Sequence, residues 1–274
     1  MDIYQEISEL FSTTSLPKRI IGKSVLGRNI YAFQIGEGYP VGIAQYALHA
    51  REWVTAKLAL HHIRMGIQTG SFWIIPLANP DGALLSQQGL YSVCDERRKE
   101  YLLRLNDGED FSLWKANARG VDLNVNFDAR WGTGAKNVRR RGAENCIGTR
   151  PFSEKETRAL VRFTKEIYPD YTLSYHTKGE EIYWYFYQSL HTCPRDKRLA
   201  EVISTSTGYP LRETKNSAGG YKDWCIQTLK IPSFTIEVGE DIRSHPLTEK
   251  DFEDIRIKNE NTLNDLAKEY QARK

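Results

Sequence analysis

His49 and Glu52 lie three residues apart, directly after the apolar run of residues 41–48. Residues at this spacing project to one side of a helical turn, so an imidazole nitrogen and a carboxylate oxygen can approach one point. Zinc accepts both donor types, at about 2.0–2.2 Å. Arg51, between them, could steady a substrate oxygen. A chance His-x-x-Glu is common, so the pair indicates a metal site only if a third ligand and a base lie further along the chain.

A second apolar segment, residues 171–176, supplies the third ligand because it ends in His176. In open α/β sheets, ligands bind beyond the carboxyl ends of the strands. His176 can therefore meet His49 and Glu52 at one edge of a sheet. Three protein ligands leave a fourth position for water, which is the pattern of catalytic rather than structural zinc. We expect one zinc ion per chain.

Glu237 is the candidate base, because it interrupts the apolar segment 233–238. Burying a carboxylate in such a strand is costly unless the group is paired or takes part in chemistry. There it could act as general base for a metal-bound water. Asp122 could accept the second ring N–H of His49 and so fix its tautomer. Each residue alone could be an ordinary satisfied polar group, but all of them together would require four coincidences at strand ends.

Composition narrows the classes of function. The 274 residues are enough for one large α/β domain. A net charge of +3, from 38 Lys+Arg and 35 Asp+Glu, is too balanced to indicate a nucleic-acid partner. No apolar run approaches the length of a membrane-spanning helix, so no membrane association is expected.

The first sixteen residues carry Asp2, Glu6 and Glu9 and lack the basic and apolar regions of a signal peptide. We therefore expect a cytoplasmic protein. A secreted protein stays an alternative if a signal peptide has been removed from the chain. The cysteines are widely spaced without a Cys-x-x-Cys, which favours free thiols over a zinc ribbon or redox pair and leaves one disulfide open. They are Cys94, Cys146, Cys193 and Cys225.

Strands and helices alternate along the chain, which predicts a mixed, mostly parallel α/β sheet with helices on both faces. There is no internal repeat and no linker, so residues 1–274 are expected to form one domain. Strands are expected over 18–35 as a hairpin, 41–48, 71–78, 171–176, 181–187 and 233–238, with an extended segment at 120–127. Helices are expected over 3–11, 53–67, 153–168, 194–208, 221–230 and 248–274, and residues 92–110 are expected to form either a helix or an excursion on the surface.

Two local motifs carry further predictions. Ser153-x-x-Glu156 resembles a capping box at the start of a helix. The sequence Asn79-Pro80-Asp81-Gly82 indicates a turn.

Over nearly its whole length, the chain resembles the zinc carboxypeptidase (M14) family. The matching stretches are Ile21-Gly22-Lys23-Ser24 with Gly27-Arg28, His49-Ala50-Arg51-Glu52-Trp53, Asn79-Pro80-Asp81-Gly82, Gly120-Val121-Asp122-Leu123-Asn124, Ser174-Tyr175-His176 and Phe234-Thr235-Ile236-Glu237. The resemblance implies a single zinc carboxypeptidase-like catalytic domain, zinc on His49, Glu52 and His176, and Glu237 as base. It also implies that Arg51 helps to bind substrate.

Within that family, residues 176–184 and 219–224 resemble the bacterial γ-D-glutamyl-diaminopimelate peptidases, which cut peptidoglycan stem peptides. The resemblance implies hydrolysis at the γ-D-Glu–diaminopimelate bond, with a muropeptide as the partner. The chain has none of the LysM repeats that such enzymes often carry, so recycled muropeptide in the cytoplasm is the expected form of the substrate.

The chain also departs from the family pattern. Digestive members grip the terminal carboxylate with an Asn-Arg pair, which here is Asn124-Val125. The arginine that polarises the scissile carbonyl corresponds to Lys115 or to Arg119, and the sequence leaves the choice open. Asn124 and Tyr221 remain candidates for binding substrate.

Lys222 falls where the resemblance places the pocket for the residue after the cut. A lysine there should favour a carboxylate, which diaminopimelate, unlike lysine, carries on its side chain. Pairing of Lys222 with the adjacent Asp223 is the alternative.

Two other functions stay open at this point. One is a general metallocarboxypeptidase that releases C-terminal amino acids. The other is an inactive peptide-binding relic, against which the four intact residues His49, Glu52, His176 and Glu237 weigh. The sequence does not give the oligomeric state.

Overall fold

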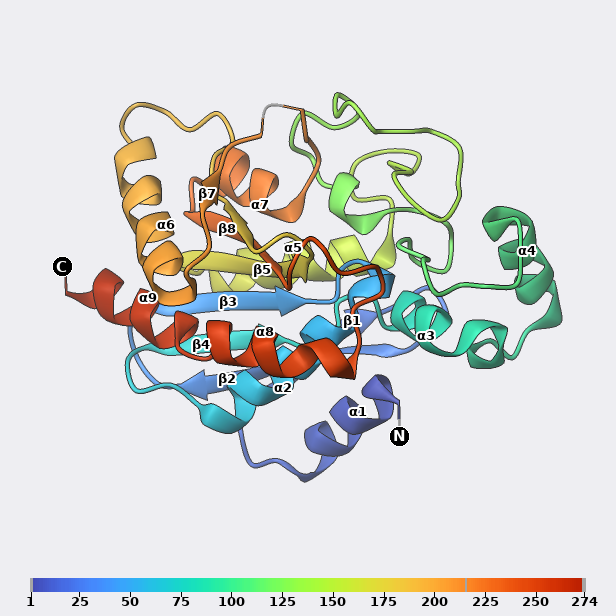
Figure 1. Ribbon diagram of the computed structural model, residues 1–274, viewed down its shortest axis with the longest axis horizontal. Coiled ribbons are helices and arrows are strands. Elements are labelled where there is room, and N and C mark those ends of the chain that lie inside the picture. Colours follow the sequence, from blue (N-terminus) through green and yellow to red (C-terminus); the bar gives the residue numbers. More distant parts are fainter. Residues whose placement is uncertain (1, 215, 273–274) are drawn as a thin grey trace.

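A mixed sheet of eight strands forms the centre of the computed structural model, which describes residues 2–214 and 216–272 (Figure 1). The order across the sheet is β1-β2-β4-β3-β5-β8-β6-β7. The central neighbours β4, β3, β5 and β8 run parallel, whereas β2 and β6 run antiparallel to the strands that flank them in this central group. The strands are β1 (Lys18–Lys23), β2 (Asn29–Gly36), β3 (Val41–Tyr46), β4 (Ser71–Ile75), β5 (Tyr171–Thr177), β6 (Glu181–Tyr183), β7 (Leu211–Arg212) and β8 (Ser233–Val238). The predicted fold class is confirmed; the short β7 was not predicted.

The parallel register of β3, β5 and β8 brings their carboxyl ends together. Tyr46 pairs with Tyr175, and one residue further along β5, His176 pairs with Glu237. All residues of β5 are buried, as expected for a strand covered on both faces. Polar side chains at these strand ends must therefore share one region at the edge of the sheet.

Helices cover both faces of the sheet. One apolar core joins the sheet to α1, α2, α6, α8 and α9, and a second core on the other face joins it to α5 and α7. Figure 1 shows α8 and α9 running across the first face. The helices are α1 (Ile3–Thr13), α2 (Val54–Met65), α3 (Pro80–Gln88), α4 (Glu96–Asn106), α5 (Lys155–Ile167), α6 (Cys193–Thr207), α7 (Tyr221–Trp224), α8 (Phe252–Asn259) and α9 (Thr262–Gln271).

Helix α3 begins where a turn was predicted. Asn79 is its N-cap and accepts a hydrogen bond from the Gly82 N–H at 3.1 Å. Pro80 occupies the first helical position, where its missing N–H costs no hydrogen bond. The same residue types that make a turn can therefore open a helix, and the prediction of an isolated turn was wrong.

Three other local predictions were also wrong. Glu154, not Ser153, is the N-cap of α5, and the Ser153 hydroxyl donates to the Glu154 carboxylate instead. Residues 123–125 form a 3-10 turn rather than an extended segment. The predicted C-terminal helix is divided into α8 and α9.

All four cysteines are free thiols, as the sequence favoured. Among residues 2–214 and 216–272, no helix combines the length and the apolar character needed to cross a membrane.

Candidate metal centre and active site

The first two candidate ligands lie on the turn that follows β3. The chain leaves the strand through Ala47, whose φ of 48° is left-handed, and enters the 3-10 turn η1 (Ala50–Glu52), with His49 as its N-cap. This turn aims both side chains the same way, so that His49 Nδ1 lies 2.9 Å from Glu52 Oε1. Both residues are buried.

His176, at the end of β5, completes the group. Its Nδ1 lies 2.9 Å from Glu52 Oε2 and 3.0 Å from His49 Nδ1. Donor atoms of the three residues all lie within 4.8 Å of one another. Neighbouring ligands in a tetrahedral zinc site lie about 3.3–3.6 Å apart, given bonds of about 2.0–2.2 Å. The observed separations of 2.9–3.0 Å are a few tenths of an ångström shorter, so two imidazoles and one carboxylate converge closely enough to hold a zinc ion after a small outward shift.

The second ring nitrogen of each histidine faces an oxygen atom, at hydrogen-bond geometry for His176 and at ion-pair distance for His49. Asp122 Oδ1 lies 3.3 Å from His49 Nε2, and the Ser174 hydroxyl lies 3.0 Å from His176 Nε2. Such outer partners fix the tautomer and orientation of a ligating imidazole. Ser174 was not predicted, although its spacing of two from His176 on a strand places both side chains on one face.

Asp122 also joins the metal group to Lys115. The Lys115 ammonium lies 3.1 Å from Asp122 Oδ2. Burial opposes the charge of Asp122, but Lys115 and then His49 hold its pKa well below the ordinary carboxyl value. Burial likewise opposes the charge of Lys115, but Asp122 shifts the net pKa of that ammonium upward. Both groups are therefore charged at neutral pH.

Glu237 stands beside His176 on β8. Burial, the largest influence, raises the pKa of Glu237 to about 7; His176 opposes the rise and Glu52 adds to it. A carboxylate with this affinity for protons can both accept a proton and release it near neutral pH.

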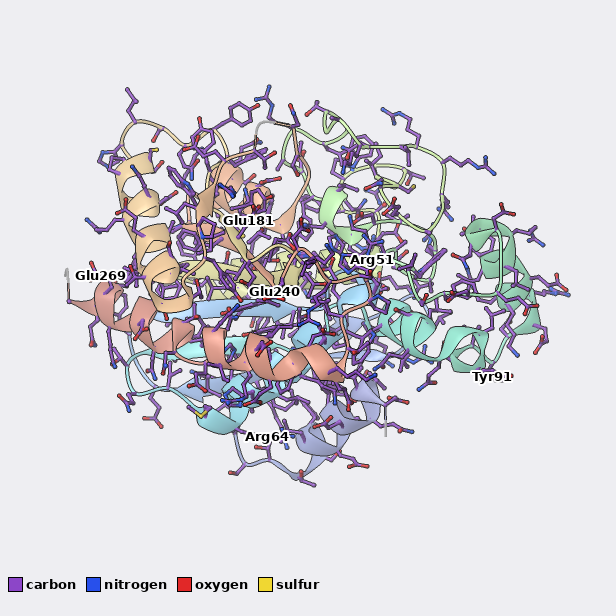
Figure 2. All side chains as sticks on the ribbon, in the orientation of Figure 1. Arg51, Arg64, Tyr91, Glu181, Glu240 and Glu269 are labelled. Atoms are coloured by element: carbon purple, nitrogen blue, oxygen red, sulfur yellow. The ribbon has the colours of Figure 1, made fainter. Side chains whose placement is uncertain are left out.

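Arg51 lies between the two ligands on η1, and Figure 2 labels it near the middle of the view. Its guanidinium points toward the loop of residues 113–144, donating to the Leu113 carbonyl at 3.3 Å and lying 3.6 Å from Glu144. Arg51 does not line the cavity that opens beside the metal group.

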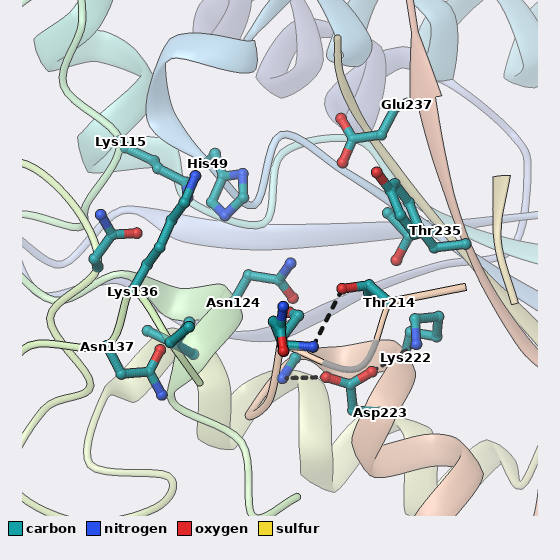
Figure 3. Close-up of a pocket in the computed structure, with 17 residues that line it drawn as sticks. His49, Lys115, Asn124, Lys136, Asn137, Thr214, Lys222, Asp223, Thr235 and Glu237 are labelled. Atoms are coloured by element: carbon teal, nitrogen blue, oxygen red, sulfur yellow. Dashed lines mark hydrogen bonds and ion pairs between the residues drawn. The ribbon is translucent and has the colours of Figure 1, made fainter. Parts of the chain in front are cut away.

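A cavity of about 440 Å³ opens beside the metal group. Figure 3 shows His49 and Glu237 on its upper side and Lys222 and Asp223 on its lower side. Its charged lining residues are Lys115, Lys136, Lys222, Asp223 and Glu237, and His49, Asn124 and Val125 also line it. Lys115 and Lys222 are each paired with a carboxylate of the protein, so the lining presents charges of both signs and suits a substrate that is itself charged.

The structure shows which of the remaining candidates for substrate contact reach the cavity. Lys115, not Arg119, reaches the cavity, because Arg119 turns toward Glu154 at 3.7 Å. Asn124 lines the cavity, and its side-chain oxygen Oδ1 accepts the Tyr221 backbone N–H at 3.1 Å. The Tyr221 ring is fully buried and its hydroxyl bonds to Thr164, so the prediction that it contacts substrate was wrong.

Two of the charged residues that line the cavity were not predicted as site residues. Asp223 is adjacent to Lys222 on α7, so its proximity could have been foreseen from the sequence. Lys136 lies in an irregular loop, residues 132–149, where no periodicity indicates the direction of a side chain. Only the three-dimensional path of that loop shows that Lys136 reaches the cavity.

Comparison with known proteins agrees with this geometry. The profile of the zinc carboxypeptidase family matches residues 4–264. Gamma-D-glutamyl-L-diamino acid endopeptidase 1 of Lysinibacillus sphaericus is 32% identical over 251 residues, which cover 84% of this chain and 62% of that protein. The chain thus spans less than two thirds of this relative.

Two solved structures share the fold. Bovine thrombin-activatable fibrinolysis inhibitor, in complex with tick carboxypeptidase inhibitor, superposes with a TM-score of 0.77 at 18% identity, covering 98% of this chain and 94% of that one. Murein-tripeptide amidase MpaA of Escherichia coli O157 gives a TM-score of 0.63 at 23% identity, covering 91% and 93%. From the family profile and the identity to the endopeptidase, the chain belongs to the zinc carboxypeptidase family.

Proposed function

We propose that the protein is a zinc-dependent peptidase that hydrolyses peptidoglycan stem peptides at the γ-D-Glu–diaminopimelate bond. The observation that carries the proposal is the convergence of His49, Glu52, His176 and Glu237 at one charged cavity. This group combines a metal-binding set with a base of suitable pKa.

The three ligand residues would hold zinc, which when bound lowers the pKa of water and polarises a carbonyl oxygen. Glu237 takes a proton from the attacking water and passes it to the leaving amine. Lys115, fixed by Asp122, supplies positive charge for the oxygen on which negative charge develops. Arg51 joins it if its guanidinium turns from Leu113 toward the substrate.

The choice of substrate rests on the charge of the cavity and on two similar proteins. A γ-D-Glu–diaminopimelate peptide carries free carboxylates on both sides of the scissile bond, which suits the lysine-rich lining. The L. sphaericus protein is named as an endopeptidase for a gamma-D-glutamyl-L-diamino acid, and the E. coli protein is named as an amidase for a murein tripeptide. Val125, which lines the cavity, offers no guanidinium to an ordinary C-terminal carboxylate.

Three further statements belong to this proposal. Residues 1–274 form a single catalytic domain. Asn124, which lines the cavity, donates its side-chain N–H to substrate. The protein acts in the cytoplasm on recycled muropeptides, which fractionation of cells would test.

A general metallocarboxypeptidase is the second candidate, because carboxypeptidase B of Bos taurus is 26% identical over 81% of this chain. The test uses zinc-loaded protein with two substrates: a γ-D-Glu–diaminopimelate peptide and an ordinary peptide with a free C-terminal residue. Our proposal requires cleavage of the first at the γ-linked bond. Preferential release of the C-terminal residue from the second would support the alternative. Cleavage of neither, with zinc bound, would favour a binding relic.

A further inference from the structure

Lys222 and Asp223 form an ion pair in the wall of the cavity, on the side away from Glu237 (Figure 3). The Lys222 Nζ lies 2.6 Å from Asp223 Oδ1, and the two side chains are only 7% and 5% exposed. Replacing a buried ion pair by apolar residues is often neutral or stabilising, so such a pair is weak evidence of a structural role. Because the pair lines the cavity next to the metal group, recognition of substrate explains its position better.

The pair keeps unused hydrogen-bonding capacity. An ammonium group has three donors. Lys222 donates to the Tyr185 carbonyl at 3.1 Å and to Asp223, and its Nζ lies 5.3 Å from the centre of the Phe186 ring, so among the described residues no oxygen or nitrogen atom accepts its third donor. Asp223 Oδ2 accepts the Gly220 N–H at 3.1 Å, which fixes the carboxylate at the start of α7. A carboxylate offers about four lone-pair sites, so Asp223 can accept further donors.

We infer that Lys222 and Asp223 together recognise a zwitterionic amino-acid group, –CH(NH3⁺)COO⁻, at the far end of the substrate side chain. The inference rests on the proposed function and names the group that this end of the cavity reads. The side chain of meso-diaminopimelate ends in such a group. Its carboxylate takes the free donor of Lys222, and its ammonium takes the free lone pairs of Asp223.

Pairing with Asp223 changes which charged ligands Lys222 favours. A single lysine would favour any carboxylate and repel any ammonium, which is what the sequence suggested. Beside Asp223 the local charge is balanced, so a lone ammonium meets Lys222 unfavourably and a lone carboxylate meets Asp223 unfavourably. Only a ligand that carries both charges matches both residues.

Three matched peptides test this in the zinc-loaded protein: γ-D-Glu linked to meso-diaminopimelate, to L-lysine, which lacks the distal carboxylate, or to L-2-aminopimelate, which lacks the distal amine. We expect kcat/KM for the diaminopimelate peptide to exceed both others by roughly tenfold or more, because a site that pairs a polar group rejects an analogue without it. Equal values for all three peptides would overturn the inference while leaving the proposed function intact.

Two variants assign the selectivity. Lys222→Met should collapse the preference for diaminopimelate over lysine, and Asp223→Asn the preference over aminopimelate. Damage to the fold alone would not produce this crossed pattern. The double variant Lys222→Met/Asp223→Asn leaves no buried charge unpaired and should lose both preferences. Lys136→Met, which removes a different lysine from the same cavity, should leave both ratios unchanged. If the kcat/KM ratios between the peptides stay the same in all Lys222 and Asp223 variants, the inference is wrong.

Failure to cleave any γ-linked peptide would refute the proposed function. A binding measurement tests the inference about Lys222 and Asp223 even in that case. By calorimetry, free meso-diaminopimelate should bind wild-type protein more tightly than L-lysine or L-2-aminopimelate does. The double variant should lose that difference. Equal affinity for the three amino acids, or no binding of any, would overturn the inference.

Discussion

His176 and Glu237 occupy directly paired positions on the parallel strands β5 and β8. A candidate metal ligand and the candidate base are therefore held together by backbone hydrogen bonds rather than by a flexible loop. Since a shift of one residue would turn either side chain to the opposite face of the sheet, this register is a condition for the chemistry.

The metal assignment predicts about one zinc ion per chain in wild-type protein. His176→Ala removes one of two imidazole ligands and should reduce the zinc content strongly, as measured by elemental analysis after dialysis. His61→Ala serves as the control, because His61 lies on α2 at a distance from the group and faces Glu260 at 3.8 Å. Equal zinc in wild type and His176→Ala would refute the ligand assignment.

Glu237→Gln should lower kcat by roughly 10²–10⁴-fold, the usual contribution of a general base. Zinc content and KM should change little, because the amide keeps the size of the side chain. The matched control is Glu181→Gln: Glu181 pairs with Glu237 across β6 and β8, but its carboxylate binds Arg212 at 2.8 Å and does not line the cavity. Near-normal turnover by Glu237→Gln would remove Glu237 from the mechanism.

Lys115→Met should reduce kcat/KM by roughly 10²-fold, as expected for losing a group that stabilises charge in the transition state. Arg119→Met should have little effect, since Arg119 turns toward Glu154 and does not line the cavity. Zinc content and thermal unfolding must be followed too, because Lys115→Met leaves Asp122 without its buried partner. The opposite order of effects would exchange the two roles.

A pH-dependent contribution to stability should come from Glu156, outside the active site. Burial raises the pKa of Glu156 from 4.5 to about 7, although its carboxylate accepts the Val25 N–H. The folded state therefore favours the protonated form. Its stabilisation is fully present below pH 4.5 and has been lost once the pH has risen through about 7, a change of about 3 kcal/mol.

Glu156→Gln cannot ionise, so its free energy of unfolding should fall less between pH 5 and pH 8 than that of wild type. Denaturant unfolding at both pH values measures the difference. Glu166→Gln, at an exposed position of the same helix, should follow the wild-type curve. Parallel curves for wild type and Glu156→Gln would show that Glu156 does not titrate in this range.

The sequence by itself identified the candidate ligand and base residues, because donor chemistry and strand periodicity are local properties. His49, His176 and Glu237 stand out as polar residues at or in apolar strands, and Glu52 follows His49 at a helical spacing. The order of buried strands and amphipathic helices likewise predicted the mixed sheet.

Only the tertiary structure decided which side chains reach the cavity. Lys115 and Arg119 are four residues apart in an irregular segment, and only the path of that segment turns one toward Asp122 and the other toward Glu154. Tyr221 and Lys222 are neighbours on α7, yet one packs in the core and the other faces the cavity. Loop paths and side-chain directions depend on packing between segments far apart in the chain, which the local residue pattern does not contain.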